Sequence, residues 1–164
     1  MRTQVITLRT TTNADVSAVD RLLQSSYTRL LKSCYSPSVQ VTAVPIISRA
    51  NPALMSSGTY YVAVDREGMI VGAGGWTRSV KGRDVADVRH VATDYRHLRQ
   101  GIARRIMMGV IAEARLAGIR RLDCLSTPVA VPFYQALGFT PQCNVTIGLR
   151  PGIDLPVVRM VRDL

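Results

Sequence analysis

Residues 98–107, LRQGIARRIM, place three arginines and a glycine at the start of an apolar helical pattern. The first N–H groups of a helix have no partner inside it, and the aligned peptide dipoles put about half a positive charge there. A glycine lets an anion approach this backbone closely, and flanking arginines add charge-assisted hydrogen bonds. The segment therefore predicts a binding site for phosphate or polyphosphate, with a solvated basic helix face as the alternative.

The positive charge of the chain is concentrated around this segment. The sequence has 21 lysines and arginines against 11 aspartates and glutamates, a formal net charge of +10. Seven arginines and a single acid, Glu113, lie between residues 96 and 121. Such a field favours an anionic partner. Nucleic acid is not expected, because aromatic residues make up only 5% of the chain and no stacking set, helix-turn-helix or zinc-finger spacing accompanies the arginines.

The composition indicates one globular domain over residues 1–164, because 47% of the residues are hydrophobic and no low-complexity tract interrupts them. No apolar run approaches the roughly 18 residues that span a bilayer, and the start, MRTQVITLRT, lacks the apolar stretch of a signal peptide. We therefore expect a cytoplasmic protein with no membrane partner. The cysteines are not at metal-ligand spacing with either histidine, so we expect buried or free thiols and no metal: Cys34, Cys124 and Cys143.

The elements that must position the basic segment are visible on both sides of it. Residues 85–93 predict a strand, and residues 101–117 predict the clearest helix of the chain, which Gly118 ends. A strand at 120–125, a short helix at 131–138 and a final strand at 155–164 follow. We therefore expect a right-handed β-α-β crossover over residues 101–125.

The first half of the chain predicts a strand at 4–9 and a helix at 12–27, with Thr12 and Asp15 in a capping arrangement. Residues 33–57 predict short helix and loop, because Pro37, Pro45 and Pro52 break the pattern. Residues 58–77 predict a hairpin that turns at residues 66–68. The order of these elements predicts an α/β layered sheet.

The glycines of this hairpin do not form a dinucleotide site. Gly72, Gly74 and Gly75 resemble the start of a GxGxxG fingerprint, but its third glycine position falls on Thr77. The run also lies in an expected strand and does not open a helix. A Rossmann site is therefore excluded.

Taken together, these segments resemble a known family. LRQGIARRIM is similar to the R/Q-x-x-G-x-G/A signature of the GNAT (general N-acetyltransferase) superfamily. VRHVATDYRHLRQGIA, AGIRRLDCL and PFYQALGF follow the order and approximate spacing of the family's central segments, and the hairpin resembles the one that precedes them. The resemblance covers most of residues 58–139. It implies the GNAT (acyl-CoA N-acyltransferase) fold, an α/β fold with a mixed central sheet flanked by helices on both faces.

The resemblance implies acetyl coenzyme A as the co-substrate, with its pyrophosphate held by the loop and the helix start. Leu98 stands where the family has arginine or glutamine, so the backbone amides of residues 99–103 must make that contact, while Ala103 is a permitted variant. The implied cofactor-binding residues come from the strand end and the signature: Val91, Ala92, Thr93, Leu98, Arg99, Gln100, Gly101, Ile102, Ala103 and Arg104.

The chemistry that the resemblance implies is direct transfer of acetyl from the thioester to an amine. Backbone N–H groups of residues 91–93 would stabilise the oxyanion. Tyr134 matches the tyrosine that protonates the departing thiolate in many members, and packing between Phe133 and Phe139 is its alternative role.

Three alternatives remove the proton from the acceptor amine: Asp87, His90 and an ordered water chain. Regular strand alternation would put Asp87, Arg89, Val91 and Thr93 on one face of the sheet and Val88, His90 and Ala92 on the other.

Two functions from different classes follow from the resemblance. The first is an N-acetyltransferase acting on a primary amine of a small molecule or a protein, and the second is a non-catalytic acyl-CoA sensor of the same fold. The family also contains many homodimers. The acceptor site has several conceivable lining residues, for each of which core packing is an equal explanation: Tyr27, Tyr35, Met55, Tyr60 and Trp76.

Overall fold

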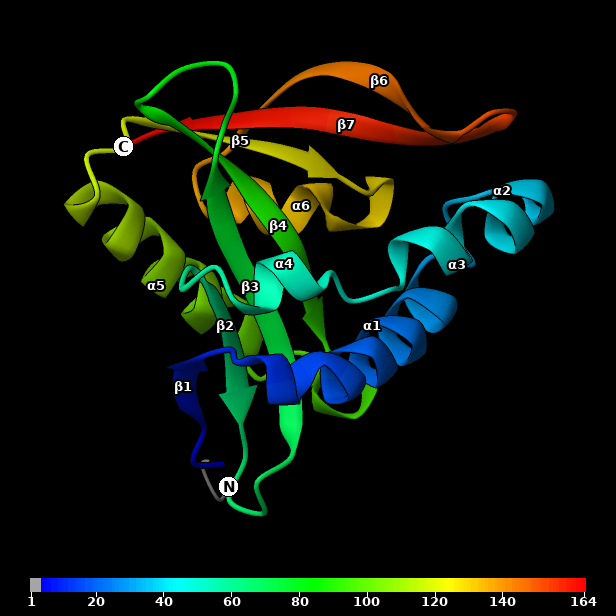
Figure 1. Cartoon of the computed structure of the whole chain (residues 1–164). Helices are drawn as coiled ribbons and strands as arrows, with labels where there is room; N and C mark the ends of the chain where they lie inside the picture. Colours follow the sequence, from blue (N-terminus) through cyan, green and yellow to red (C-terminus); the bar gives the residue numbers. More distant parts are fainter. Residues whose placement is uncertain (1–3) are drawn as a thin grey trace.

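A seven-stranded mixed sheet forms the centre of the computed structural model, which describes residues 4–164 (Figure 1). The strand order is β1-β2-β3-β4-β5-β7-β6, and only the pair β4·β5 is parallel. The strands are β1 Thr7–Thr10, β2 Tyr60–Val64, β3 Ile70–Arg78, β4 Val85–Thr93, β5 Arg121–Ser126, β6 Thr140–Arg150 and β7 Ile153–Asp163.

Helices cover both faces of this sheet. They are α1 Val16–Leu30, α2 Pro37–Thr42, α3 Val44–Ile47, α4 Pro52–Met55, α5 Ile102–Leu116 and α6 Val131–Ala136, with short 3-10 turns at Asn13–Asp15, Tyr95–His97 and Pro128–Ala130. In Figure 1, α1 and α4 lie in front of the sheet and α5 lies behind it. The predicted mixed sheet with helices on both faces is confirmed.

Each face has its own hydrophobic core. Val62 packs in the cluster under α1, whereas its neighbour Ala63 packs in the cluster under α5, as the alternation of a strand requires. On α5, apolar residues recur at helical spacing and are all buried: Ile102, Ile106, Met107, Val110, Ile111 and Ala114. Gly118 follows the helix with φ +83, which confirms its predicted role at the helix end.

The prolines of residues 33–57 begin helices, whereas the sequence pattern suggested only that they interrupt structure. Pro37, Pro45 and Pro52 each lie in the first turn of α2, α3 or α4. A proline is favoured there because the first N–H groups of a helix have no intrahelical acceptor. The prediction of short helix and loop is confirmed.

The eleven-residue strand β6 was not predicted from the sequence. It is an edge strand of the sheet, paired on one side only, with β7. Its first half is exposed, and Pro141, Asn144 and Gly148 weaken its strand pattern. Apolar alternation is confined to Val145, Ile147 and Leu149, which are partly buried, so the pattern from which strands are read is short.

The strands β4 and β5 stay paired over a short distance only. Residues 85–87 of β4 pair in parallel with residues 121–123 of β5. Beyond these residues the two strands run apart (Figure 1). The helix α5 connects them, so the predicted β-α-β crossover is confirmed. The divergence leaves room between two neighbouring strands at the carboxyl end of β4.

The glycines of β3 permit close packing. A Cβ at Gly72 would lie 2.6 Å from the Cγ2 atom of Ile102, and one at Gly75 would lie 2.3 Å from the carbonyl oxygen of Thr59. These glycines lie inside a strand and open no helix, in agreement with the exclusion of a dinucleotide site. Among residues 4–164, no helix has the length and apolar character needed to cross a membrane.

Candidate active site

A β-bulge interrupts β4 next to the point where β4 and β5 diverge. Ala73 pairs with Ala92 and Gly75 pairs with Arg89, so β4 has one residue more than β3 over this stretch. Neither His90 nor Val91 has a partner in this register, and His90 has a φ of +39. A β-bulge next to a cavity commonly re-aims backbone and side chains at a functional site.

The bulge makes the predicted alternation wrong beyond Arg89. Val88 and Val91 both pack against the core under α5, although regular alternation would put them on opposite faces. Ala92 packs against the core under α1. The extra residue shifts the phase of the strand by one position, which reverses the faces of the residues that follow it.

Buried Tyr60 and partly buried Tyr27 hold the peptide groups of the bulge. The hydroxyl of Tyr60 donates to the carbonyl oxygen of His90 at 2.7 Å, and that of Tyr27 donates to the carbonyl oxygen of Val91 at 3.4 Å. Because a trans peptide group is planar, the N–H groups of Val91 and Ala92 point away from these hydroxyls. Burial raises the pKa of Tyr60 well above its usual value, so its hydroxyl remains a donor.

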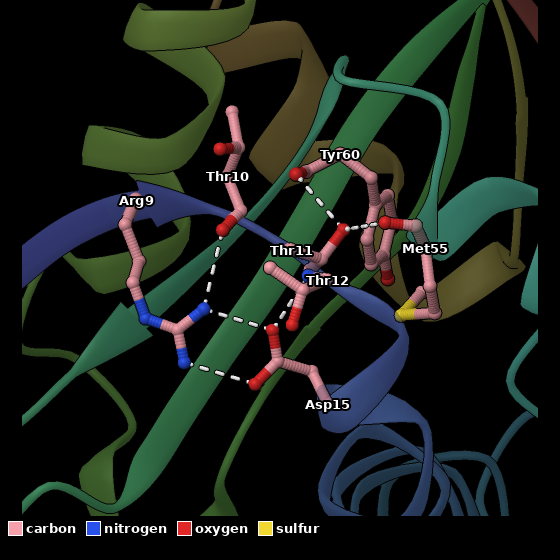
Figure 2. Close-up of polar contacts among 7 residues, drawn as sticks. All are labelled: Arg9, Thr10, Thr11, Thr12, Asp15, Met55 and Tyr60. Carbon is pink, nitrogen blue, oxygen red and sulfur yellow. Dashed lines mark hydrogen bonds and ion pairs between the residues drawn. The ribbon is translucent and has the colours of Figure 1, made fainter.

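A polar network ties Tyr60 to the start of α1 (Figure 2). The Thr11 hydroxyl contacts the carbonyl oxygens of Met55 at 2.9 Å and Tyr60 at 3.2 Å. The Arg9 guanidinium donates to both carboxylate oxygens of Asp15, at 2.8 and 2.9 Å, and the backbone N–H of Thr12 donates to the same carboxylate. The hydrogen bonds from Arg9 lower the pKa of Asp15. The predicted capping pair of Thr12 and Asp15 is therefore present.

The start of α5 presents an open backbone. Gly101 has a φ of +74, and among residues 4–164 no heavy atom beyond its chain neighbours lies within 4 Å of the position that its Cβ would occupy. No side chain of this part of the protein caps the helix. Gly101 therefore allows the left-handed turn and leaves the first N–H groups of the helix accessible to an anion.

The arginines near this turn have different environments. Arg96 pairs with Asp94 at 2.9 Å, and Arg105 donates to the carbonyl oxygen of Ile6 at 3.1 Å. Arg99 and Arg104 line a cavity of about 440 Å³. The basic stretch therefore combines structural arginines with arginines that face a cavity.

This first cavity extends from the end of β4 to the start of α5. All of the residues expected to bind the cofactor line it, except Gln100. Its other walls come from α1 and from the segment around α6, where Tyr27, Thr127 and Phe133 contribute. The buried side chain of Ser26 on α1 also lines it.

A second cavity of about 480 Å³ shares part of its wall with the first one. Asp87 and His90 line the second cavity, and Tyr134 lines both. The other residues shared by the two cavities are Tyr27, Val91, Thr127 and Ala130. The structure therefore brings the three expected catalytic residues to one cavity, and it makes Tyr134 a wall residue of both cavities.

Tyr134 is buried and keeps its proton. Its ring packs edge-on against Phe133 and Phe139, with centroid distances of 5.1 and 5.4 Å. Burial, with the neighbouring Cys124 next, raises the pKa of Tyr134 well above its usual value. Tyr134 therefore packs against Phe133 and Phe139, which is the alternative role stated above, and it also lines both cavities.

The two candidate bases differ in their surroundings. Asp87 lies beside Asp123 in the parallel register and opposite Thr77 in the antiparallel one. Burial, and then the charge of Arg89, lower the pKa of His90 below its usual value of about 6.5. His90 is therefore neutral at pH 7 and has a nitrogen lone pair available to accept a proton.

The second cavity also contains a charged cluster that no sequence motif indicated. Asp123 is 4% exposed and forms ion pairs with Lys81 at 2.9 Å, Arg159 at 3.3 Å and Arg121 at 3.4 Å. Burial by itself would raise the pKa of Asp123, but the hydrogen bond from Lys81 and the surrounding charges outweigh it and lower that pKa. These residues come from β5, β7 and the loop after β3, so only the fold assembles them.

Most of the conceivable acceptor-lining residues belong to the core. Only Tyr27 lines the second cavity, whereas Tyr35, Met55, Tyr60 and Trp76 are buried in hydrophobic clusters. Core packing is the explanation that holds for those four residues.

Comparisons with solved structures agree with this geometry. A GCN5-related N-acetyltransferase from Rhodopseudomonas palustris is 18% identical and has a TM-score of 0.80, with 100% of this chain and 99% of that chain covered. PaiA N-acetyltransferase from Thermoplasma acidophilum, solved with coenzyme A, is 13% identical with a TM-score of 0.76 over 98% and 99% of the two chains. Phosphinothricin acetyltransferase from Sinorhizobium meliloti, solved with acetyl-CoA, is 19% identical with a TM-score of 0.70 over 99% and 89%.

Sequence comparison gives the family directly. None of the curated proteins matches the chain. The model of the acetyltransferase (GNAT) domain matches residues 32–155, which include the bulge of β4, the start of α5 and Tyr134. With the fold and the family model in agreement, the chain belongs to the GNAT acetyltransferase family.

Proposed function

We propose that the chain is an acetyl-CoA-dependent N-acetyltransferase that transfers acetyl directly to a primary amine of a small molecule or a protein. The observation that carries this proposal is that two cavities share Tyr134 as a lining residue. A two-substrate transfer without a covalent intermediate needs separate sites for donor and acceptor that meet at the reacting atoms. Solved relatives of the same fold hold coenzyme A or acetyl-CoA, which supports the donor.

The first cavity is proposed to hold acetyl-CoA. The open amides after Gly101 and the side chains of Arg99 and Arg104 would contact its pyrophosphate. Residues 91–93 would line the arm that leads to the thioester. Leu98 offers no polar contact, and its side chain is 41% exposed, so the backbone must supply that binding energy.

The bulge and Tyr134 are proposed to carry the chemistry. As the amine nitrogen forms a bond to the acetyl carbon, the C–S bond breaks, the amine loses a proton and the thiolate gains one. The N–H group of Val91, held by the hydrogen bond from Tyr60 to His90, would stabilise the oxyanion. Tyr134 would protonate the thiolate. Asp87 or His90, both on the second cavity, would accept the amine proton directly or through water.

Thermal unfolding with acetyl-CoA tests the donor site. A ligand at 100 times its dissociation constant stabilises a protein by about 2.7 kcal/mol, so millimolar acetyl-CoA should raise the melting temperature of the wild-type protein by several degrees. Gly101→Ala should reduce acetyl-CoA affinity roughly tenfold or more, because a methyl group would stand where the anion approaches the backbone.

Gly118→Ala is the matched control for this experiment. Gly118 lies at the other end of α5 with φ +83, and its Cβ position is equally open. Both substitutions should cost about 1–2 kcal/mol of stability, because each forces alanine into the left-handed region. Equal acetyl-CoA affinity in the two variants, or no shift in the wild type, would remove the start of α5 from the donor site.

A further inference from the structure

The second cavity has a wall whose chemistry changes along its length. On β7, Leu155, Val157 and Arg159 occupy every second position and all line the cavity, so they share one face of the strand. The Cα atoms of residues 155 and 159 are separated by about 13 Å at the usual rise of a strand. The cavity is therefore aliphatic at one end of this wall and cationic at the other.

The cationic end has more positive than negative charge. Lys81, Arg89 and Arg159 line the cavity, with Asp87 and Asp123 as its acids. Asp123 is already shared by Lys81, Arg121 and Arg159. One carboxylate cannot saturate the hydrogen-bond donors of three cations.

Arg159 has donors left for a ligand at this end. Its side chain is 31% exposed and lines the cavity, and its Nη2 atom donates to Asp123 at 3.3 Å. A guanidinium has five N–H donors, so this contact leaves others for an acceptor oxygen in the cavity. A carboxylate of the substrate would take them with charge-assisted hydrogen bonds.

The aliphatic end is built from three elements. Ile47 of α3, and Ile147 and Leu149 of β6, line it together with Leu155 and Val157 of β7. Leu155 is paired with Ile147 across the two strands. Every lining side chain at this end is branched and apolar, so it would accept an aliphatic group and reject a charged one.

Resting on the proposed function, we infer that the acceptor is a small amine that bears both a carboxylate and an aliphatic group, in the class of aliphatic α-amino acids. The carboxylate lies at the end with Lys81, Arg89 and Arg159, and the aliphatic side chain lies over Val157, whose Cα atom is about 7 Å from that of residue 159, and points toward Leu155. Polyamines are rejected, because their additional ammonium groups would meet either these cations or the aliphatic surface.

Paired acceptors test this class. Thiol release from saturating acetyl-CoA is measured with L-leucine, with L-leucinamide and with spermidine. We expect kcat/KM to be at least tenfold higher for leucine than for either of the others, since hydrogen bonds to a charged partner are the stronger ones. A peptide with an N-terminal leucine is the fourth acceptor, and equal turnover of leucine, leucinamide and the peptide overturns the inference.

Variants separate carboxylate recognition from general damage. Lys81→Gln and Arg159→Gln should raise KM for leucine about tenfold more than KM for leucinamide, and Arg159→Lys should recover part of the loss. Arg115→Gln, an exposed arginine at the end of α5, is the control that changes neither acceptor. Equal losses on both acceptors contradict the inference. Should Arg159→Gln fail to fold, Lys81→Gln decides, because the Lys81 side chain is 50% exposed.

A binding experiment distinguishes failure of this inference from failure of the proposed function. Calorimetry with the protein loaded with coenzyme A compares N-acetyl-L-leucine with N-acetyl-L-leucinamide. Preference for the carboxylate in the absence of turnover would support the acceptor class and contradict the transferase. Turnover of amines with no preference for a carboxylate in either assay would support the transferase and contradict the acceptor class. Absence of binding by both compounds overturns the acceptor class.

Discussion

Tyr134→Phe is expected to lower kcat by about 100-fold or more while leaving the dissociation constant of acetyl-CoA nearly unchanged. General acids contribute roughly 10²–10⁴ in rate, and phenylalanine removes only the hydroxyl. The ring would keep its edge-on contacts with Phe133 and Phe139, so the fold and the wall of the donor cavity should persist. Steady-state kinetics and acetyl-CoA titration, each on the same preparation, measure the two quantities.

The pH profile gives a second readout of this role. Because burial raises the pKa of Tyr134 well above about 10, the tyrosine keeps its proton throughout the neutral and mildly alkaline range. Its deprotonation should therefore cause no fall in rate up to about pH 9. Tyr61→Phe is the control, since Tyr61 packs under α5 and lines neither cavity. Unchanged kcat in Tyr134→Phe would leave Tyr134 as a packing residue only.

Gly75→Ala is expected to destabilise the protein by roughly 3 kcal/mol or more, or to prevent folding. The added methyl group would lie 2.3 Å from the carbonyl oxygen of Thr59 and 2.6 Å from the Cα atom of Tyr60. Both are backbone atoms, so no side-chain rotation can relieve the contact, and overpacking of this kind costs more than a typical surface substitution. The disturbance would reach Tyr60, whose hydroxyl holds the carbonyl of His90.

Gly109→Ala is the matched control for this stability prediction. Gly109 lies inside α5 with no heavy atom within 4 Å of its Cβ position. Alanine there should stabilise the helix by about 0.5–1 kcal/mol. Urea unfolding of both variants gives the two free energies, and similar midpoints would contradict the close contact of β3 with residues 59 and 60.

The sequence was most informative where local pattern decides structure. Residue spacing alone predicted the buried apolar face of α5, the glycine after this helix and the strand before it. The structure confirms all three. The helix start at Gly101 was recognisable because glycine and arginines in that position have a local physical reason. The residues expected to bind the cofactor came from the family resemblance, and nearly all of them line one cavity.

The features that escaped prediction depend on pairing between distant segments. The bulge of β4 arises from one extra residue against β3, and nothing in VRHVAT distinguishes it from a regular strand. Arg159 and Lys81 meet Asp123 only because β7 inserts beside β5 and the loop after β3 folds over the same end. The edge strand β6 alternates only over its second half, where Val145, Ile147 and Leu149 pack against a cluster that includes side chains of the distant residues 31–44.

Amine-dependent release of free coenzyme A thiol is the measurement that tests the central claim most directly. The folded protein, with acetyl-CoA and a panel of primary amines, should release one thiol for each N-acetylated amine detected by mass spectrometry. The release should fall sharply in Tyr134→Phe and persist in Tyr61→Phe. Tight binding of acetyl-CoA with no amine-dependent release across the panel would contradict the enzyme and identify the chain as an acyl-CoA-binding module.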